Sequence, residues 1–285
     1  MGILMDTFNK NFEKATGMTV DEAQRAIKNQ KEITARTGNN VSFDSSYNND
    51  WNRYTAINGL SDNFANALKD ALGYYKKEFK VNPRANLYSD WEEMPYGVEG
   101  MAFEIPNDKG NYDVNLRNVR DHTERNAKET ATEAEQAGWW AKGYGDNLNG
   151  VPTHELGHVL TFQLFPNYDK VKNLYTDAMK DVGVDYDPKS QKSVLQAAKK
   201  AKEISGYAAA SNALPPYAPW NDEYETIAEA LTDYYYNRDK AADLSKAIVK
   251  RMKNKGATYG LEQAGGVAGP NETFMQNLRR YSAIQ

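Results

Sequence analysis

The chain has 285 residues, of which 40% are hydrophobic and 12% aromatic, enough to bury the core of one large domain or two modest ones. Its 35 basic and 39 acidic residues give a net charge of −4 with no long block of either sign, which argues against nucleic acids and membranes as partners. The sequence contains no cysteine, so disulfide bonds, thiol catalysis and cysteine metal sites are excluded, and any metal must bind to His, Asp or Glu.

The N-terminal residues MGILMD carry a short apolar run that meets an acidic residue at once, unlike the apolar core of a Sec-type signal peptide. The sixth position also lacks the Ser or Thr of a myristoylation motif. No apolar stretch approaches the roughly 20 residues that a membrane helix needs. These features leave three locations open: the cytoplasm, a virus particle, or export by a leaderless route.

Three segments are expected along the chain. Residues 1–58 are polar and rich in Asn, and we expect a loosely organised N-terminal extension with one helix, which begins at Thr19 as N-cap with Glu22 three residues later. Residues 59–255 should form the main domain. Residues 256–285 should form a Gly-rich linker and a short C-terminal helix.

The main domain shows both helical and strand patterns, so we predict an α+β fold. Apolar residues at helical spacing follow Ser61 and predict a core-facing helix that ends before Pro83: Phe64, Leu68, Leu72, Tyr75 and Phe79. Strand patterns cover 85–91, 101–105 and 112–118, and the turn-rich connector between the last two predicts a hairpin. Further helices are predicted over 151–165, 167–183, 193–205, 222–241 and 242–255, with a loop over 206–222.

Two of the three histidines lie in the stretch VPTHELGH, which we expect to be helical. Residues four apart on a helix project from the same face, so His154 and His158 can bind one ion. Glu155 follows the first histidine, and its carboxylate can reach a water on the metal without binding the metal itself. Gly157 weakens a helix by roughly 1 kcal/mol relative to Ala, which indicates that another element packs closely there. This spacing predicts a catalytic zinc site.

A catalytic zinc site takes three protein ligands, so a third is required. His122 lies in a charged segment that we expect to be at the surface. The string ETIAEA instead places Glu225 and Glu229 on one helix face. We predict Glu225 as the ligand and Glu229 as the partner of the free N–H of a ligating histidine. Glu223 is the competing carboxylate, but its place at the helix start suits the helix dipole.

The HELGH stretch followed by ETIAEA resembles the gluzincin zinc metallopeptidases, and more narrowly the catalytic domain of the anthrax-lethal-factor type, between about residues 60 and 240. The resemblance implies a zincin-like fold in which a small mixed sheet, with an edge strand over the cleft, packs on the active-site helix and on a mostly helical C-terminal lobe. It also implies Glu225 as third zinc ligand and Glu229 as the buttress of a histidine.

The resemblance further implies a transition-state tyrosine at Tyr207 in SGYAAAS, where a hydroxyl aimed at the developing oxyanion is physically sensible. The segment between Tyr207 and Glu225 is longer than in that family, which leaves Tyr217 and Tyr224 as substitutes. GWWAKGYGDNLNG is similar to the family's approach loop. The strand 112–118 is similar to its edge strand, which holds the substrate backbone.

The leading hypothesis is a zinc-dependent endopeptidase, a hydrolase in which Glu155 assists the attack of zinc-bound water on a peptide or protein substrate. The alternative is a protease-like structural or binding module of a phage particle or toxin, in which zinc only stabilises the fold; the flexible termini would suit docking to a larger assembly. A third possibility is a pro-segment, with residues 1–58 covering the cleft.

Overall fold

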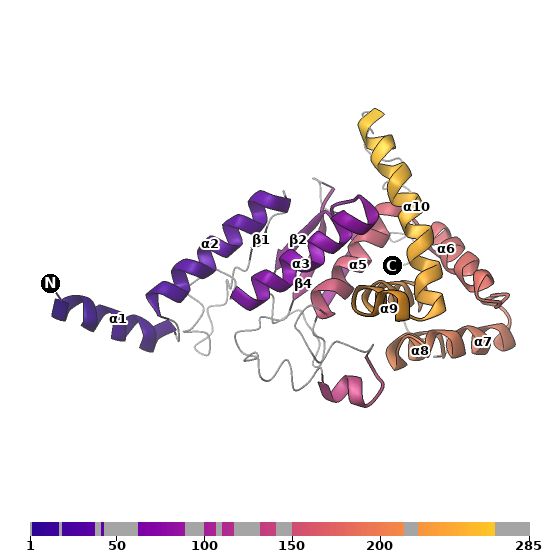
Figure 1. Ribbon diagram of the computed structural model, residues 1–285, viewed down its shortest axis with the longest axis horizontal. Coiled ribbons are helices and arrows are strands. Elements are labelled where there is room, and N and C mark those ends of the chain that lie inside the picture. Colours follow the sequence, from indigo (N-terminus) through magenta and orange to yellow (C-terminus); the bar gives the residue numbers. More distant parts are fainter. Residues whose placement is uncertain are drawn as a thin grey trace, which may run out of the picture.

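The computed structural model describes residues 2–16, 19–37, 41–42, 62–88, 100–106, 110–116, 132–140, 150–213 and 222–265. The fold is α+β and mostly helical, with one small sheet (Figure 1). The labelled helices are α1 (Gly2–Thr16), α2 (Val20–Thr37), α3 (Asp62–Phe79), α5 (Gly150–Leu164), α6 (Tyr168–Asp181), α7 (Gln191–Ala201), α8 (Gly206–Ala213), α9 (Asp222–Asn237) and α10 (Asp243–Gly265), with a 3-10 turn η2 (Arg238–Lys240). A further short helical turn covers residues 132–136.

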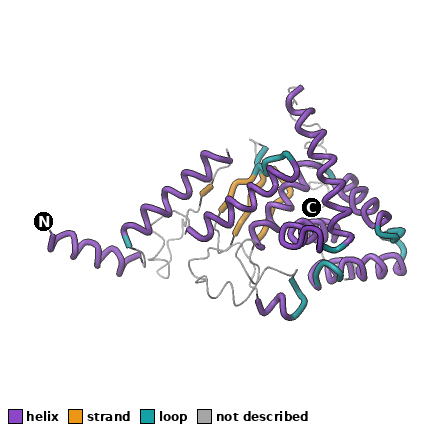
Figure 2. The backbone as a smooth tube through the Cα atoms, viewed as in Figure 1, coloured by secondary structure: helices purple, strands orange, loops and turns teal. Residues whose placement is uncertain are grey.

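The sheet consists of β1 (Val41–Ser42), β2 (Ala85–Tyr88), β3 (Gly100–Pro106) and β4 (Tyr112–Leu116) in the order β1-β2-β4-β3. β1 and β2 are parallel, as are β2 and β4, whereas β3 and β4 form the predicted antiparallel hairpin. The sheet is therefore mixed. Figure 2 shows the strands gathered between α1 and α2 on one side and the C-terminal helices on the other.

The prediction that 112–118 is the edge strand is wrong. β4 lies between β2 and β3, and its inward residues Tyr112, Val114 and Leu116 are all buried. β3 occupies the edge instead, where Phe103 and Ile105 remain exposed. β4 pairs with β3 on one side and, in parallel, with β2 on the other. Local patterning predicts the hairpin but does not reveal the parallel pairing across it.

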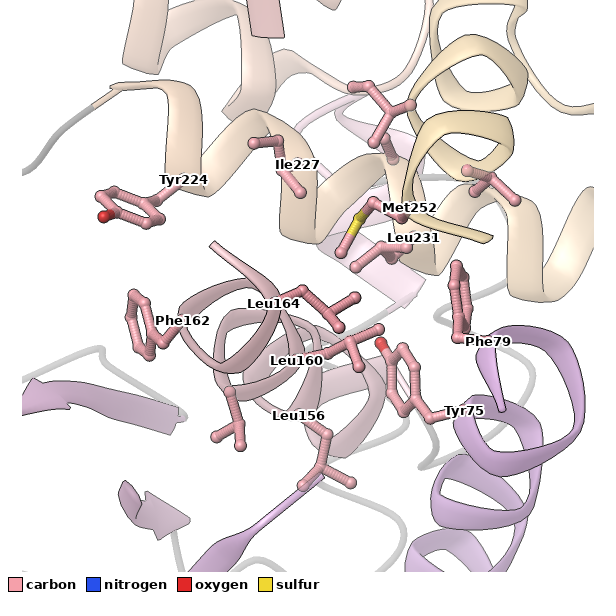
Figure 3. Packing of buried hydrophobic residues seen from close by; sticks show 14 of the residues in the cluster. Tyr75, Phe79, Leu156, Leu160, Phe162, Leu164, Tyr224, Ile227, Leu231 and Met252 are labelled. Carbon is pink, nitrogen blue, oxygen red and sulfur yellow. The ribbon is translucent and has the colours of Figure 1, made fainter. Parts of the chain in front are cut away.

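Helix α5 is the centre of the domain. Every residue from Pro152 to Leu164 is buried, as expected for a helix that other elements cover on all sides. It packs against α3, α9, β3 and β4. In Figure 3, Leu160 and Leu164 of α5 face Leu231 of α9 and Tyr75 of α3.

Gly157 marks a close approach between α5 and α9. A Cβ atom at this position would lie 3.1 Å from the Tyr75 hydroxyl oxygen, 3.2 Å from Cδ1 of Leu231 and 3.5 Å from Cα of Ala228. Another element does pack closely here, as the sequence indicated. The two helices that carry the candidate metal ligands therefore contact each other through a glycine.

The N-terminal segment is more ordered than predicted. The predicted capping box opens α2, since the Thr19 N–H donates to Glu22 Oε2 at 2.8 Å and the Glu22 N–H to Thr19 Oγ1 at 3.2 Å. α1 was not predicted. α2 packs on α3 through the fully buried Ile33, and β1 pairs with β2 at the sheet edge opposite β3. The described residues of 1–42 therefore lie away from β3, and residues 43–58 lie outside the described part of the chain.

Two other predicted segments differ from the structure. Residues Gly206–Ala213, predicted as loop, form α8, and α10 continues through Gly265 although a linker was predicted from Gly256 onward. A Cβ atom at Gly256 would lie 3.2 Å from the carbonyl carbon of Phe79 and still closer to its oxygen, so this glycine lets α10 cross the end of α3. The predicted terminal helix near Asn271 lies outside the described residues. Among the described helices, none has both the length and the apolar content of a membrane span.

Candidate metal centre

Three predicted ligands meet where α5 faces the first turns of α9. His154 Nε2 lies 3.1 Å from His158 Nε2 and 3.1 Å from Glu225 Oε2, and His158 Nε2 lies 3.4 Å from the same carboxylate oxygen. One ligand atom from each residue lies within 4.8 Å of the others. Both histidines are buried and Glu225 is partly buried.

This arrangement suits a metal ion. Two ligand atoms bound at about 2.1 Å in a tetrahedral site lie about 3.4 Å apart. The three separations are close to that value, and the donor set of two imidazole nitrogens and one carboxylate oxygen leaves a fourth position open. The cluster could therefore hold a metal ion with little movement of the ligands.

Glu229 supports the cluster from behind. Its Oε1 lies 2.9 Å from Nδ1 of His154, and its side chain is almost fully buried. Once the ring is neutral, a carboxylate at Nδ1 holds the remaining proton on that nitrogen and leaves Nε2 to bind a metal. Glu225 and Glu229, predicted on one helix face, thus both reach His154, one at each ring nitrogen.

The charges within the cluster stabilise one another. Burial disfavours the charged form of His154, but hydrogen bonds to Glu225 and Glu229 outweigh it and raise the imidazole pKa well above its usual value. Burial likewise opposes ionisation of Glu225, yet the facing histidines hold its pKa well below the usual range. Glu225 is therefore ionised and ready to bind a cation.

Glu155 points from α5 toward the start of β3. A Cβ atom at position 100 would lie 2.6 Å from both Cγ and Oε1 of Glu155, so a larger residue there would displace this carboxylate. The backbone N–H of Ala102 donates to it, and burial raises its pKa above the ordinary value of 4.5. The sequence analysis missed Gly100, although a glycine in a strand often marks the close approach of another group.

Tyr207 lies at the start of α8, beside the cluster. Its ring centroid is 6.1 Å from that of His154, and its hydroxyl donates to Glu225. Burial, together with the charge of Glu225, raises the pKa of the phenol above 10.0, so it remains protonated at neutral pH. Tyr207 is thus close enough to donate a hydrogen bond to a group bound at the cluster.

The other tyrosine candidates differ. The Tyr224 hydroxyl donates to Glu104 Oε1 on β3 at 3.0 Å, and its ring packs edge-on against Phe162. Phe162 in turn stacks on His158 with 6.0 Å between centroids, a contact that the sequence did not predict. Tyr224 is therefore bonded to β3 rather than to the ligands. Tyr217 lies outside the described residues.

The competing ligands take no part in the cluster. Glu223 is buried and accepts hydrogen bonds from Tyr168 at 3.1 Å and Tyr186 at 3.2 Å, so both of its carboxylate oxygens are engaged away from the histidines. His122 lies outside the described residues. Of the two carboxylates considered as third ligand, Glu225 and Glu223, the geometry therefore favours Glu225.

Comparison with known proteins adds no relative: no family model, no curated protein and no solved structure matches this chain. Its function has to be inferred from the residues of the site. These combine three metal-ligating groups, a buried carboxylate on the same helix and a protonated phenol.

Proposed function

We propose that this protein is a zinc-dependent endopeptidase of zincin-like fold. The observation that carries the proposal is the meeting of His154, His158 and Glu225 in one cluster, with Glu155 beside it on the same helix. The HELGH pattern alone could arise by coincidence, whereas a carboxylate from a distant helix at 3.1 Å and 3.4 Å from the two histidines supports a built site.

Zinc is the metal that the donor set favours. Imidazole nitrogens with one carboxylate are typical of catalytic zinc, and the backing of His154 by Glu229 is typical of zinc-bound histidine. When bound, zinc supplies Lewis acidity and a water whose pKa is lowered to about 7. The absence of cysteine from the chain excludes the thiolate-rich structural zinc sites.

Glu155 is proposed as general base and then general acid. It takes a proton from the attacking water and transfers it to the amine that leaves when the peptide bond breaks. A carboxylate whose pKa is raised by burial serves both steps better, because it holds the proton long enough to deliver it. Its place between α5 and β3 puts it beside both the ligands and the edge strand.

Tyr207 is proposed to stabilise the developing oxyanion. The phenol is protonated at neutral pH and already donates to Glu225, one of the ligands. A short rotation of the side chain would turn the hydroxyl toward a substrate carbonyl oxygen bound at the cluster. Donors of this kind contribute most where water is excluded, and Tyr207 is partly buried.

β3 is the strand best placed to hold a substrate. Among the described strands it pairs only with β4, so its second edge is available for hydrogen bonds with an extended peptide. Glu155 accepts from Ala102 of this strand, which links the proposed base to the peptide-binding edge. This assigns to β3 the role that the resemblance had given to residues 112–118.

The proposal is tested by incubating a peptide library with zinc-loaded wild type and zinc-loaded Glu155→Gln. We expect the wild type to cut peptides and the variant to lose roughly 10²- to 10⁴-fold in rate while keeping its zinc. If both proteins bind zinc and neither cuts any peptide, the metal is structural and the chain is a protease-like module.

A further inference from the structure

The start of α8 is fastened to a segment that is distant in sequence. The backbone N–H of Gly206 donates to the carbonyl of Gly138 at 2.7 Å, and the N–H of Tyr207 donates to the carbonyl of Trp139 at 2.8 Å. These two N–H groups belong to the first turn of a helix, where no partner exists within the helix itself. We call this pair of hydrogen bonds the 138–207 latch.

The latch depends on glycine at both ends. A Cβ atom at position 206 would meet the Gly138 carbonyl carbon at 3.2 Å and its oxygen at a still shorter distance. Gly138 has a φ angle of 68°, a left-handed conformation that other residues rarely adopt. Any side chain at Gly206 would push the two segments apart. Because Tyr207 is the next residue, its side chain would move with the backbone.

The latch continues through the side chains to the metal cluster. The rings of Trp139 and Tyr207 meet edge to face at 6.2 Å between centroids, with 61° between their planes. The Tyr207 ring also lies 6.1 Å from the His154 ring, and its hydroxyl donates to Glu225. Trp139 itself is 49% exposed, so this indole contributes more to the position of Tyr207 than to the core.

We propose that Gly138, Trp139 and Gly206 are positioning residues for Tyr207, which they hold against the ligand Glu225. The body of α8 packs on α7 and α9, and its first turn is also held by Ser205 and by Thr226 of α9. The latch adds the contact that ties the backbone of Tyr207 itself to residues 138–139. Because a hydrogen bond from Tyr207 orients the carboxylate of Glu225, the latch tunes metal affinity as well as any oxyanion contact. The second of these effects rests on the proposed peptidase function; the first does not.

The test is a double-mutant cycle in zinc affinity, measured by competition with a chelator of known affinity. Tyr207→Phe removes the hydroxyl, and Gly206→Ala opens the latch. We expect each variant to bind zinc about tenfold more weakly, as is typical when a group behind a metal ligand is lost. The double variant should be no weaker than either single one, because both changes remove the same hydrogen bond.

Gly73→Ala is the matched control, since a Cβ atom at that exposed position of α3 meets nothing within 4 Å. It should bind zinc as the wild type does. The proposal is overturned if Gly206→Ala also binds zinc like the wild type. It is equally overturned if the fold loss of zinc affinity in the double variant equals the product of the losses in Gly206→Ala and Tyr207→Phe.

Trp139→Ala provides a second route if Gly206→Ala does not fold, because a half-exposed side chain tolerates substitution. Trp139→Ala should weaken zinc binding when introduced into the wild type and have no further effect when introduced into the Tyr207→Phe variant. An equal loss of zinc affinity in both cases contradicts the proposal. Cleavage assays on the same variants separate the two ideas. If the effects on zinc affinity are coupled but neither the wild type nor any variant cuts peptides, the positioning role of the latch stands and the peptidase function is contradicted. If the wild type cuts peptides but the effects on zinc affinity are not coupled, the peptidase function stands and the positioning role is contradicted.

Discussion

Nδ1 of His154 lies 2.9 Å from Oε1 of Glu229, on the side of the ring opposite the nitrogen that faces His158 and Glu225. One imidazole therefore joins two carboxylates of α9, one at each nitrogen. Because Glu229 is almost fully buried, this contact is shielded from water and fixes both the orientation and the protonation of the ring.

Glu229→Gln should weaken zinc binding by roughly 10- to 100-fold, because the neutral amide no longer raises the basicity of His154. Chelator competition measures the affinity. Glu203→Gln is the control, since Glu203 is an exposed surface residue whose carboxylate pairs with Lys200 at 2.8 Å. An unchanged affinity in Glu229→Gln would show that the contact with His154 does not support the metal site.

The pH dependence of metal binding follows from the raised pKa of His154. Its proton must leave before a metal can bind at the ring, so the proton competes with zinc at pH values above 6.5, the ordinary pKa of histidine. Zinc affinity should therefore still increase with pH above neutrality. Affinity that is constant between about pH 6.5 and pH 8 would contradict this competition.

The metal-free protein should show the opposite trend in stability. A pKa that is raised on folding contributes stability that is complete below the unfolded pKa of 6.5 and is lost as pH rises through the folded value. Denaturant unfolding of chelator-treated protein should therefore give a decreasing free energy of unfolding above pH 6.5, whereas zinc-loaded protein should not lose stability there.

Gly157→Ala should destabilise the protein although alanine favours helix. The added methyl group would lie 3.1 Å from the Tyr75 hydroxyl and 3.2 Å from Leu231. Overpacking of this kind costs about 1–3 kcal/mol, which exceeds the gain of about 1 kcal/mol in helix propensity. Chemical denaturation measures the change in the free energy of unfolding.

Gly73→Ala makes the same chemical change on α3 without a contact, so it should stabilise by about 0.5–1 kcal/mol. Tyr75→Phe removes the hydroxyl that donates to the Thr153 carbonyl at 2.5 Å and also the atom nearest the new methyl group. Gly157→Ala should therefore cost less in a Tyr75→Phe background. A Gly157→Ala variant as stable as Gly73→Ala would contradict the close approach of α5 and α9.

The site could be predicted largely from local sequence because helices repeat regularly. His154 and His158 are four apart, as are Glu225 and Glu229, so each pair shares a helix face whatever the rest of the fold does. The sequence does not say how far apart these two faces lie. The structure supplies that distance, and it also shows the Tyr224 hydroxyl bonded to Glu104 of β3.

The wrong predictions concern features that long-range contacts decide. The order of β3 and β4 depends on β2, which pairs with β4 and not with β3. The small residues of Gly206–Ala213 led to the prediction of a loop, and the glycine at 256 led to the prediction of a linker. In the structure both glycines mark places where two backbones nearly touch, Gly206 at Gly138 and Gly256 at Phe79.

The most direct test is the zinc content of protein purified without chelators. Elemental analysis should find about one zinc per chain in the wild type and in Glu155→Gln, because Glu155 is not a ligand. Glu225→Gln should lose most of its zinc, because it removes the charged third ligand. Zinc-free wild type, or full zinc in Glu225→Gln, would contradict the assignment of His154, His158 and Glu225 as the metal site.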